Sequence, residues 1–481
     1  MPFEMLSHVC RVAAATARRG ARTLFPQPAF FPHVCVALAL CGLTWNARAN
    51  TLQWNTNRNR VSAELRAAPL DSVLKEVSAA TGWSVYLEPD TSLRVSAKFK
   101  DLPPGQALPL LLGRLNFALA PGTNASSKLF VFRTSATHAT QLVPPEHAAI
   151  PTGNTNLLAN ELIVRLKPGA KIDELAAKLG AKVKGRIEEL GTYRLEFADE
   201  EAAEAARQSL ATNEDVQSVD DNFSIDRPIS PSPLQASTTP PPVKLQLKPP
   251  PEDGRVIVGL IDTAVQPLGN DLDSFILKQI SVAGTPQLAP GEPSHGTSMA
   301  ETILRSLQAI TKGSTAVQIL PVDVYGANPS TSTFDVANGI VQAVNGGAKI
   351  VNLSLGSEAD SPFLKDIIAE VSKKNIPIFA AAGNEPVTTP FYPAAYPGVT
   401  AVTAVEQGQL APYASRGSFV DVAAPGTSVV YYNNQPYYVV GTSAAAAFTS
   451  GIAAGYLDST GNSVERMRSF ITNNFGVKLG K

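Results

Sequence analysis

Three residues in the second half of the chain are of the types that nucleophilic acyl transfer requires. They are Asp262 in VGLIDTAV, His295 in SHGTSMA and Ser443 in VGTSAAAAFTSG. A serine hydroxyl becomes an effective nucleophile when a histidine takes its proton and a carboxylate orients that histidine. The three residues therefore predict an acyl-transfer site with Ser443 as nucleophile, His295 as general base and Asp262 as the orienting group.

The surroundings of these residues strengthen that interpretation. His295 is the only histidine after His147, and a histidine with a pKa of about 6.5 is the usual general base near neutral pH. Asn384 follows the apolar run IPIFAAAG, where its side-chain amide and the backbone N–H of Ser443 could bind an oxyanion. Each residue also has an ordinary alternative, namely a turn at Asp262 or Asn384, an exposed or capping His295 and a helix N-cap at Ser443.

The order and content of these segments resemble the catalytic motifs of the subtilisin-like serine proteases, the subtilases. The resemblance covers residues 254–460 and implies that catalysis needs no metal or organic cofactor. It implies that the substrate backbone pairs with an edge strand containing Ser354, Leu355 and Gly356. It places the wall of the pocket for the residue before the scissile bond at Ala381, Ala382 and Gly383.

The chain departs from the family pattern at three alanines. Ala264 replaces the usual glycine after Asp-Thr, Ala444 the usual methionine after the serine, and Ala447 the usual proline near the helix start. These changes concern the shape of the pocket and leave every catalytic atom in place. Structural calcium is a further possibility at Asp271 and Asp273, although a solvated surface turn is the better interpretation.

The segment after residue 253 has the pattern of an α/β domain. Apolar runs typical of buried parallel strands alternate with amphipathic helical segments; the runs are RVIVGLID, VQILPVDVY, AKIVNLSLG, IPIFAAAG and GVTAVTAV. We therefore predict a doubly wound α/β fold with a mostly parallel sheet over residues 254–481. Ligands in such folds bind beyond the carboxyl ends of the strands.

A smaller α+β domain is expected over residues 158–227. Its β-α-β-β-α-β pattern indicates a ferredoxin-like sandwich and resembles the inhibitor-I9-like propeptides of subtilases. We call it the propeptide-like domain. The Pro-rich residues 228–253 follow as a linker that we expect to be extended and accessible, either as a spacer or as the segment in which maturation cleavage occurs.

Another α+β domain is predicted over residues 58–133, followed by a polar linker at 134–157. Its repeated strand–helix scheme resembles the short N-terminal domain of secretins and TonB-dependent receptors. Two roles remain open for this N-terminal domain, which are docking to another component of the cell envelope and passive spacing.

Residues 1–49 have the features of an export signal. Arginines precede an apolar stretch that ends in Ala47-Arg48-Ala49, an A-x-A cleavage pattern. An uncleaved membrane anchor or lipidation at Cys41 are the alternatives. All three cysteines, Cys10, Cys35 and Cys41, lie in this segment, so the remaining chain has neither a disulfide framework nor a cysteine-based metal site.

The composition fits these predictions. The 481 residues include 44% hydrophobic residues and carry a net charge of −1, which gives no reason to expect a nucleic-acid partner. We expect a secreted, periplasmic or envelope serine endopeptidase made as a zymogen, with polypeptide substrates and its own propeptide as partners. An envelope partner would bind through residues 58–133. The alternative from another class is a catalytically silent binding scaffold with the same fold.

Overall fold

The structure, a computed structural model, describes residues 51–477 with short gaps at 56–59, 90, 92, 114, 121–126, 135, 137–138, 144–155, 235–239, 253 and 462. The predicted export signal therefore lies outside the described residues. Within the described range, none of the helices combines enough length with enough apolar character to cross a bilayer.

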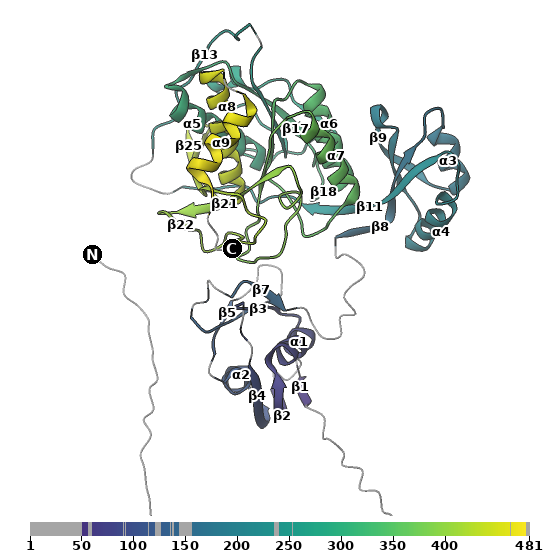
Figure 1. The fold of residues 1–481 in the computed structure, drawn as a ribbon, viewed down its shortest axis with the longest axis vertical. Coiled ribbons are helices and arrows are strands. Elements are labelled where there is room, and N and C mark those ends of the chain that lie inside the picture. Colours follow the sequence, from purple (N-terminus) through teal and green to yellow (C-terminus); the bar gives the residue numbers. More distant parts are fainter. Residues whose placement is uncertain are drawn as a thin grey trace, which may run out of the picture. The chain divides into compact units, whose positions relative to one another are not determined.

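In the described part of the chain, the α/β domain is built around an eight-stranded sheet (Figure 1). The order is β15-β17-β14-β19-β20-β21, with β23 and the antiparallel β22 both paired to β21. The strands are β14 (Ile257–Asp262), β15 (Ile280–Ser281), β17 (Gln318–Asp323), β19 (Ile350–Leu353), β20 (Ile378–Ala381), β21 (Val399–Glu406), β22 (Gln409–Leu410) and β23 (Val422–Pro425). The predicted doubly wound, mostly parallel architecture is confirmed, because every strand except β22 runs parallel to its neighbours.

Helices cover both faces of this sheet. One hydrophobic cluster joins the sheet to α5 and α8, and a second joins it to α6 and α7, and Figure 1 shows these pairs on opposite sides. The helices are α5 (His295–Thr311), α6 (Thr333–Asn345), α7 (Pro362–Lys373), α8 (Thr442–Thr460) and α9 (Val464–Phe475). The sheet is therefore apolar on both faces, as its continuous apolar strands predict.

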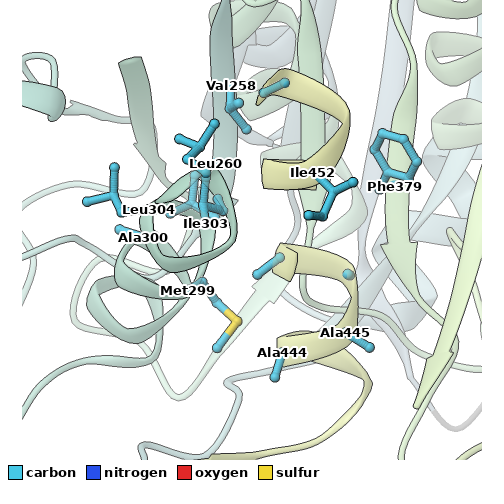
Figure 2. Packing of buried hydrophobic residues seen from close by; sticks show 14 of the residues in the cluster. Val258, Leu260, Met299, Ala300, Ile303, Leu304, Phe379, Ala444, Ala445 and Ile452 are labelled. Atoms are coloured by element: carbon cyan, nitrogen blue, oxygen red, sulfur yellow. The ribbon is translucent and has the colours of Figure 1, made fainter. Parts of the chain in front are cut away.

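Small residues let α5 and α8 pack closely beside the sheet. Figure 2 shows Met299 and Ile303 of α5 facing the same core as Ala444 and Ala445 of α8. A Cβ atom at Gly451 of α8 would lie 2.0 Å from the Ser306 Oγ and 2.5 Å from the Ile303 carbonyl oxygen. Glycine is therefore required at this helix crossing, which holds the starts of the two helices in fixed positions.

The propeptide-like domain has the predicted β-α-β-β-α-β order. Its elements are β8 (Leu157–Leu166), α3 (Ile172–Leu179), β9 (Lys182–Ile187), β10 (Thr192–Glu196), α4 (Glu200–Leu210) and β11 (Val216–Asp226). Its sheet has the order β11-β8-β10-β9 and continues beyond β11 into β18 (Ser330–Ser332) of the α/β domain. Backbone hydrogen bonds therefore join the two domains directly.

The N-terminal domain repeats a strand–helix scheme, as the sequence predicts. Its elements are β1 (Thr51–Asn55), β2 (Arg60–Pro69), α1 (Leu70–Thr81), β3 (Ser84–Leu87), β4 (Arg94–Leu102), α2 (Pro104–Leu112), β5 (Asn116–Ala120), β6 (Lys128–Phe132) and β7 (Gln141–Val143). Strand β7 extends the domain beyond residue 133 by pairing with β3. Below, the N-terminal domain means residues 51–143; its likeness to secretin domains stays a prediction.

The Pro-rich segment is accessible only in part, which corrects the expectation of a uniformly exposed linker. Val243 and Leu245 are buried in the core around α5 and α8, and Lys248 forms an ion pair with Asp458. Strand β13 (Gln246–Leu247) pairs with β16 (Ser314–Thr315). We call residues 240–248 the strap. Proline prevents regular pairing over most of the segment. The apolar side chains of the strap nevertheless pack on the α/β domain.

Candidate active site

Asp262 lies at the carboxyl end of β14, in the middle of the sheet. Strands β17 and β19 pair with β14 on its two sides, and the Asp262 side chain is fully buried. The N–H of Thr263 donates a 2.6 Å hydrogen bond to its Oδ1 atom. The strand end thus fixes a buried carboxylate at the edge where ligands bind in open α/β sheets.

His295 is the first residue of α5 and meets this carboxylate directly. Its Nδ1 atom lies 2.8 and 2.9 Å from the two Oδ atoms of Asp262. Ser294 caps the helix by accepting a 3.0 Å hydrogen bond from the N–H of Thr297. A Cβ at Gly296 would lie 2.1 Å from the Thr263 carbonyl oxygen, so only glycine permits this approach of helix and strand.

This contact determines what the imidazole can do. With Nδ1–H donating to Asp262, the neutral ring has Nε2 as its acceptor atom. Nε2 is the atom that a general base uses to take a proton from a serine hydroxyl. The buried carboxylate would also stabilise the imidazolium that forms after the transfer.

Ser443 is the second residue of α8, where the N–H groups of the helix end favour negative charge. Its Oγ donates a 3.2 Å hydrogen bond to the carbonyl oxygen of Ser354, and the Ser354 Oγ donates in return to the Ser443 carbonyl oxygen at 3.1 Å. Asn352 and Ser450 extend this buried network, with distances of 2.9 Å (Asn352 Nδ2 to Ser354 Oγ) and 3.0 Å (Ser450 Oγ to Asn352 Oδ1). Ser443 is therefore held against the segment that follows β19, and acting as a nucleophile would require its proton to pass to Nε2 of His295.

Asn384 lies just after β20 and is oriented by Thr442, the residue before Ser443. Its Oδ1 accepts hydrogen bonds from the N–H of Thr442 at 2.8 Å and from the Thr442 Oγ1 at 2.9 Å. Gly441 has φ 144°, and a Cβ there would lie 3.0 Å from the Asn384 Nδ2. With Oδ1 occupied by Thr442, Nδ2 is the group that remains to donate to a substrate oxygen.

The structure brings the predicted residues together around one cavity of about 740 Å³. His295, Ser443 and Asn384 line it, and Asp262 lies behind His295. Of the predicted substrate-binding residues, those on the cavity wall are Ser354, Leu355, Gly356, Ala381 and Gly383. Ala382 is not among the lining residues; it is fully buried, and its N–H donates to the Val402 carbonyl oxygen at 2.9 Å.

Two sequence profiles match the chain. The profile described as Subtilase family matches residues 253–478, and the profile described as Fervidolysin N-terminal prodomain matches residues 144–222. Thermitase of Thermoactinomyces vulgaris is 32% identical over 222 residues, which are 45% of this chain and 79% of thermitase. The chain belongs to the subtilase family.

Other relatives agree with this assignment. The thermophilic serine proteinase of Bacillus sp. (strain AK1) is 32% identical over 214 residues, 43% of this chain, and the match spans only 53% of that relative's length. The crystal structure of fervidolysin from Fervidobacterium pennivorans, a keratinolytic enzyme related to subtilisin, has a TM-score of 0.50 and 21% identity. That match covers 63% of this chain and 55% of fervidolysin and shows a shared fold. The α/β domain is thus a subtilisin-like serine endopeptidase domain preceded by a prodomain.

The three alanines that depart from the subtilase pattern are structural. Ala444 and Ala447 are fully buried in the core between α8 and the sheet, and Ala264 is 2% exposed. The Ala264 carbonyl oxygen accepts a 2.6 Å hydrogen bond from the Ser294 Oγ, at the start of α5. None of the three lines the cavity, so they influence the site through the positions of α5 and α8.

Asp273, one of the two aspartates considered for calcium, supports a turn in this structure. Its carboxylate accepts hydrogen bonds from the N–H groups of Leu268 at 2.6 Å and Gly269 at 3.1 Å. Within the described ranges, no three His, Cys, Asp or Glu side chains gather as a metal site would require. Subtilases need no cofactor for catalysis.

The cavity is also lined by residues that the sequence motifs did not predict. Residues 226–232, which lead out of the propeptide-like domain, line it together with His295, Ser443 and Asn384. Before the cavity, Ser224 of β11 pairs with Ser332; after it, β12 (Ser232–Pro233) pairs with β25 (Gln435–Val440). The chain between these two pairings therefore runs along the wall of the cavity, where Ile229 is 90% exposed. Only the Pro-rich composition hinted at this path, because the pairing depends on strands distant in sequence.

Glu385 is a further lining residue that sequence reasoning missed. It follows Asn384 directly, and its carboxylate contacts Tyr86 and Lys128 of the N-terminal domain. Nothing in the local sequence distinguishes this glutamate from a solvated loop residue.

Proposed function

We propose that the chain is an exported serine endopeptidase that is made as a zymogen and cuts its own pro-segment within residues 226–232. The observation that carries this proposal is the buried Asp262–His295 pair, with Ser443 and Asn384 on the same cavity.

The proposed reaction begins when the Ser443 Oγ attacks the carbonyl carbon of the scissile bond. The hydroxyl proton passes to Nε2 of His295, and Asp262 stabilises the imidazolium through Nδ1. Asn384 Nδ2 and the N–H of Ser443 donate to the oxyanion, and one such donor is worth about 100- to 1000-fold in turnover. His295 then protonates the leaving amine, and water hydrolyses the acyl-enzyme by the same roles in reverse.

Polypeptide substrates fit the shape and lining of the site. Ser354, Leu355 and Gly356 line one side of the cavity, and there an extended substrate backbone would pair with their main chain. Ala381 and Gly383 leave space on the opposite wall for the side chain before the scissile bond. A Cβ at Gly356 would lie 2.5 Å from the Tyr392 carbonyl oxygen, so the width of the pocket depends on that glycine.

The zymogen state is supported by the contacts between the propeptide-like domain and α6. Asn222 Oδ1 accepts hydrogen bonds from the Thr333 Oγ1 and from the N–H of Phe334, both at 3.1 Å, and so caps the start of α6. Arg194 bridges Glu161 of the same domain and Asp335 of α6, at 2.7 and 2.8 Å. These contacts hold β11 at the entrance to the cavity.

The strand that enters the cavity is fastened just before the proposed cut. The Arg227 Nη2 donates to the Gly326 carbonyl oxygen at 2.7 Å, and its guanidinium lies 5.3 Å from the centroid of the Tyr325 ring. The Tyr325 Oη donates to the Asp226 carbonyl oxygen at 3.1 Å, and burial raises the pKa of Tyr325 so that it stays a neutral donor.

The bond between Ile229 and Ser230 is the most suitable place for self-cleavage. Between Pro228 and Ser232 it is the only peptide bond with no proline on either side. The strap, further along, is packed on the α/β domain by buried Val243 and Leu245 and is therefore protected from cleavage. The expected maturation region thus narrows from 228–253 to the part of the segment that crosses the cavity.

Export and an envelope location are proposed from residues 1–49 alone. The positive, apolar and A-x-A features of that segment are those of a secretory signal. Cleavage at Ala49 would leave a mature precursor that begins with the N-terminal domain.

Reaction with a serine-directed phosphonate probe tests the activity. We expect the wild-type chain to be labelled at Ser443 and the Ser443→Ala chain to remain unlabelled. The Asn384→Ala chain should keep its label but lose about 100- to 1000-fold in turnover of a peptide substrate. A folded wild-type chain that takes no label would support the silent binding scaffold instead.

A further inference from the structure

A carboxylate at the edge of the cleft is held by two side chains of the N-terminal domain. The Tyr86 Oη donates a 2.7 Å hydrogen bond to the Glu385 Oε2, and the Lys128 Nζ lies 2.7 Å from the Glu385 Oε1. Glu385 directly follows Asn384, the proposed oxyanion donor. The contact therefore lies one residue from the catalytic machinery.

Apolar and backbone contacts surround this polar core. Tyr86 and Ala139 form a buried cluster with Val387, and the Tyr86 ring stacks on Phe130 with centroids 5.2 Å apart. The N–H of Thr388 donates to the Thr140 carbonyl oxygen at 3.2 Å. The N-terminal domain thus contacts one loop of the α/β domain, residues 383–391. The contacts are an ion pair, aromatic packing and a backbone hydrogen bond. We call this loop the docking loop.

Charge distribution favours the docked arrangement. Burial opposes ionisation of Glu385, but the hydrogen bonds from Lys128 and Tyr86 outweigh it and lower the pKa of this carboxyl. Glu358, on the same cavity, has a raised pKa because it is buried and lies near Glu385. Lys128 therefore supplies the positive charge that keeps two acidic groups compatible at this edge.

The N-terminal domain also forms part of the cavity wall. Ser84, Tyr86 and Leu142 line the cavity together with Pro228 and Ser443. A substrate that enters along this edge meets both the segment crossing the cleft and a domain placed beside it.

We propose that the N-terminal domain is a second intramolecular cover of the catalytic cleft, docked on the docking loop through Tyr86 and Lys128. This inference rests on the proposed protease function. It assigns residues 51–143 a partner within the same chain, in place of the envelope component or the passive spacer that the sequence leaves open.

Covalent linkage makes the two covers act together. Cleavage between Ile229 and Ser230 leaves the N-terminal and propeptide-like domains on one fragment. When one domain of that fragment dissociates, the other keeps it at a high effective concentration, which strengthens binding without new contacts. The cleft would open fully only when both domains are released or degraded.

Hydrogen exchange of the uncut Ser443→Ala chain tests the docking. Adding Tyr86→Phe and Lys128→Ala should make amides of the docking loop exchange about tenfold faster, because local opening becomes easier. Lys100→Ala, which changes an exposed lysine on β4 of the same domain, should leave the loop unchanged. Unchanged exchange of α1 would show that the double variant still folds.

Phosphonate labelling of the self-processed chain tests the covering role. The Tyr86→Phe/Lys128→Ala chain should be labelled several-fold faster than the wild-type chain, and the Lys100→Ala chain at the wild-type rate. Equal exchange of the docking loop in all variants would overturn the docking, and faster exchange with equal labelling would overturn the covering role. A wild-type chain that never labels would instead refute the protease function, while the exchange comparison would still decide the docking.

Discussion

The α/β domain is covered at two places by contacts of different physical character. The propeptide-like domain is joined by backbone pairing of β11 with β18 and by the bridge from Arg194 to Glu161 and Asp335. The N-terminal domain is joined by an ion pair whose partners, Lys128 and Glu385, are 32% and 48% exposed, and by aromatic packing. Buried charges depend strongly on their partners, whereas exposed pairs contribute little and are screened by salt. The N-terminal domain should therefore dissociate first and the propeptide-like domain last.

The largest effect is expected from breaking the buried bridge. Arg194→Met should weaken binding of the propeptide-like domain by about 3–5 kcal/mol, because Glu161 and Asp335 would be left buried without their shared cation. The matched control is Arg186→Met, since Arg186 pairs with the exposed side chains of Asp173 and Glu188. Calorimetry of the Ser443→Ala chain with each change measures the difference. Equal unfolding temperatures for the Arg194→Met and Arg186→Met chains would show that the buried bridge stabilises the protein no more than the exposed ion pairs do.

The strap is a third contact with the α/β domain, and it is linked to the buried carboxylate of Glu301 on α5. Burial raises the pKa of Glu301 to about 7, although the N–H of Tyr431 and the side chain of Arg305 donate to it. Both partners also hold the strap, because Tyr431 Oη donates to the Pro240 carbonyl oxygen and Arg305 Nη1 to that of Pro241. Packing of the strap on the α/β domain should therefore weaken or strengthen with pH near neutrality. The contacts of the propeptide-like domain and the N-terminal domain should not change in this range.

The direction of this pH dependence follows from the difference in proton binding by Glu301 between the folded and unfolded chain. Between its ordinary value of 4.5 and about 7, Glu301 binds a proton more strongly in the folded chain than in the unfolded chain. Stability from this group is thus fully present below pH 4.5 and is lost as the pH rises to 7, by roughly 3 kcal/mol. Glu301→Gln should flatten the unfolding free energy across that range. An unaltered pH profile in denaturant titrations would show that Glu301 is not the group responsible.

The smallest effect is expected from salt on the contact of the N-terminal domain. Raising ionic strength from about 0.1 to 1 M shortens the screening length from about 10 to 3 Å, which weakens the exposed Lys128–Glu385 pair. Hydrogen exchange of the docking loop should become a few-fold faster. Exchange of amides in β11 should not change, because backbone pairing carries that contact. Equal salt responses of the two regions would contradict the proposed order of release.

The sequence was sufficient to predict the regular elements and most of the side chains that gather at the cavity. Strands such as β14 and β20 are largely apolar runs; Asp262 is the last residue of β14, and Asn384 lies three residues after the end of β20. His295 and Ser443 could be found because each lies at the start of a helix beside a run of small residues. These features depend on residues that are close in sequence, so composition and periodicity are enough to predict them.

Features that depend on contacts between distant segments could not be predicted. Val243 and Leu245 stand among prolines and show no period, so their burial against α5 and α8 was not visible. Glu385 acquires its role only when Tyr86, 299 residues away in sequence, is placed beside it. Ala382 lies between two cavity residues, and only the direction of its side chain excludes it from the wall.

Identification of the new N-terminus in self-processed protein shows whether the site cuts its own chain between Ile229 and Ser230. The wild-type chain should yield a fragment that begins at Ser230 and retains the α/β domain, and the Ser443→Ala chain should remain whole under the same conditions. A Ser443→Ala chain that is cut at the same bond, or a wild-type chain cut only within the strap, would contradict self-cleavage in the cavity.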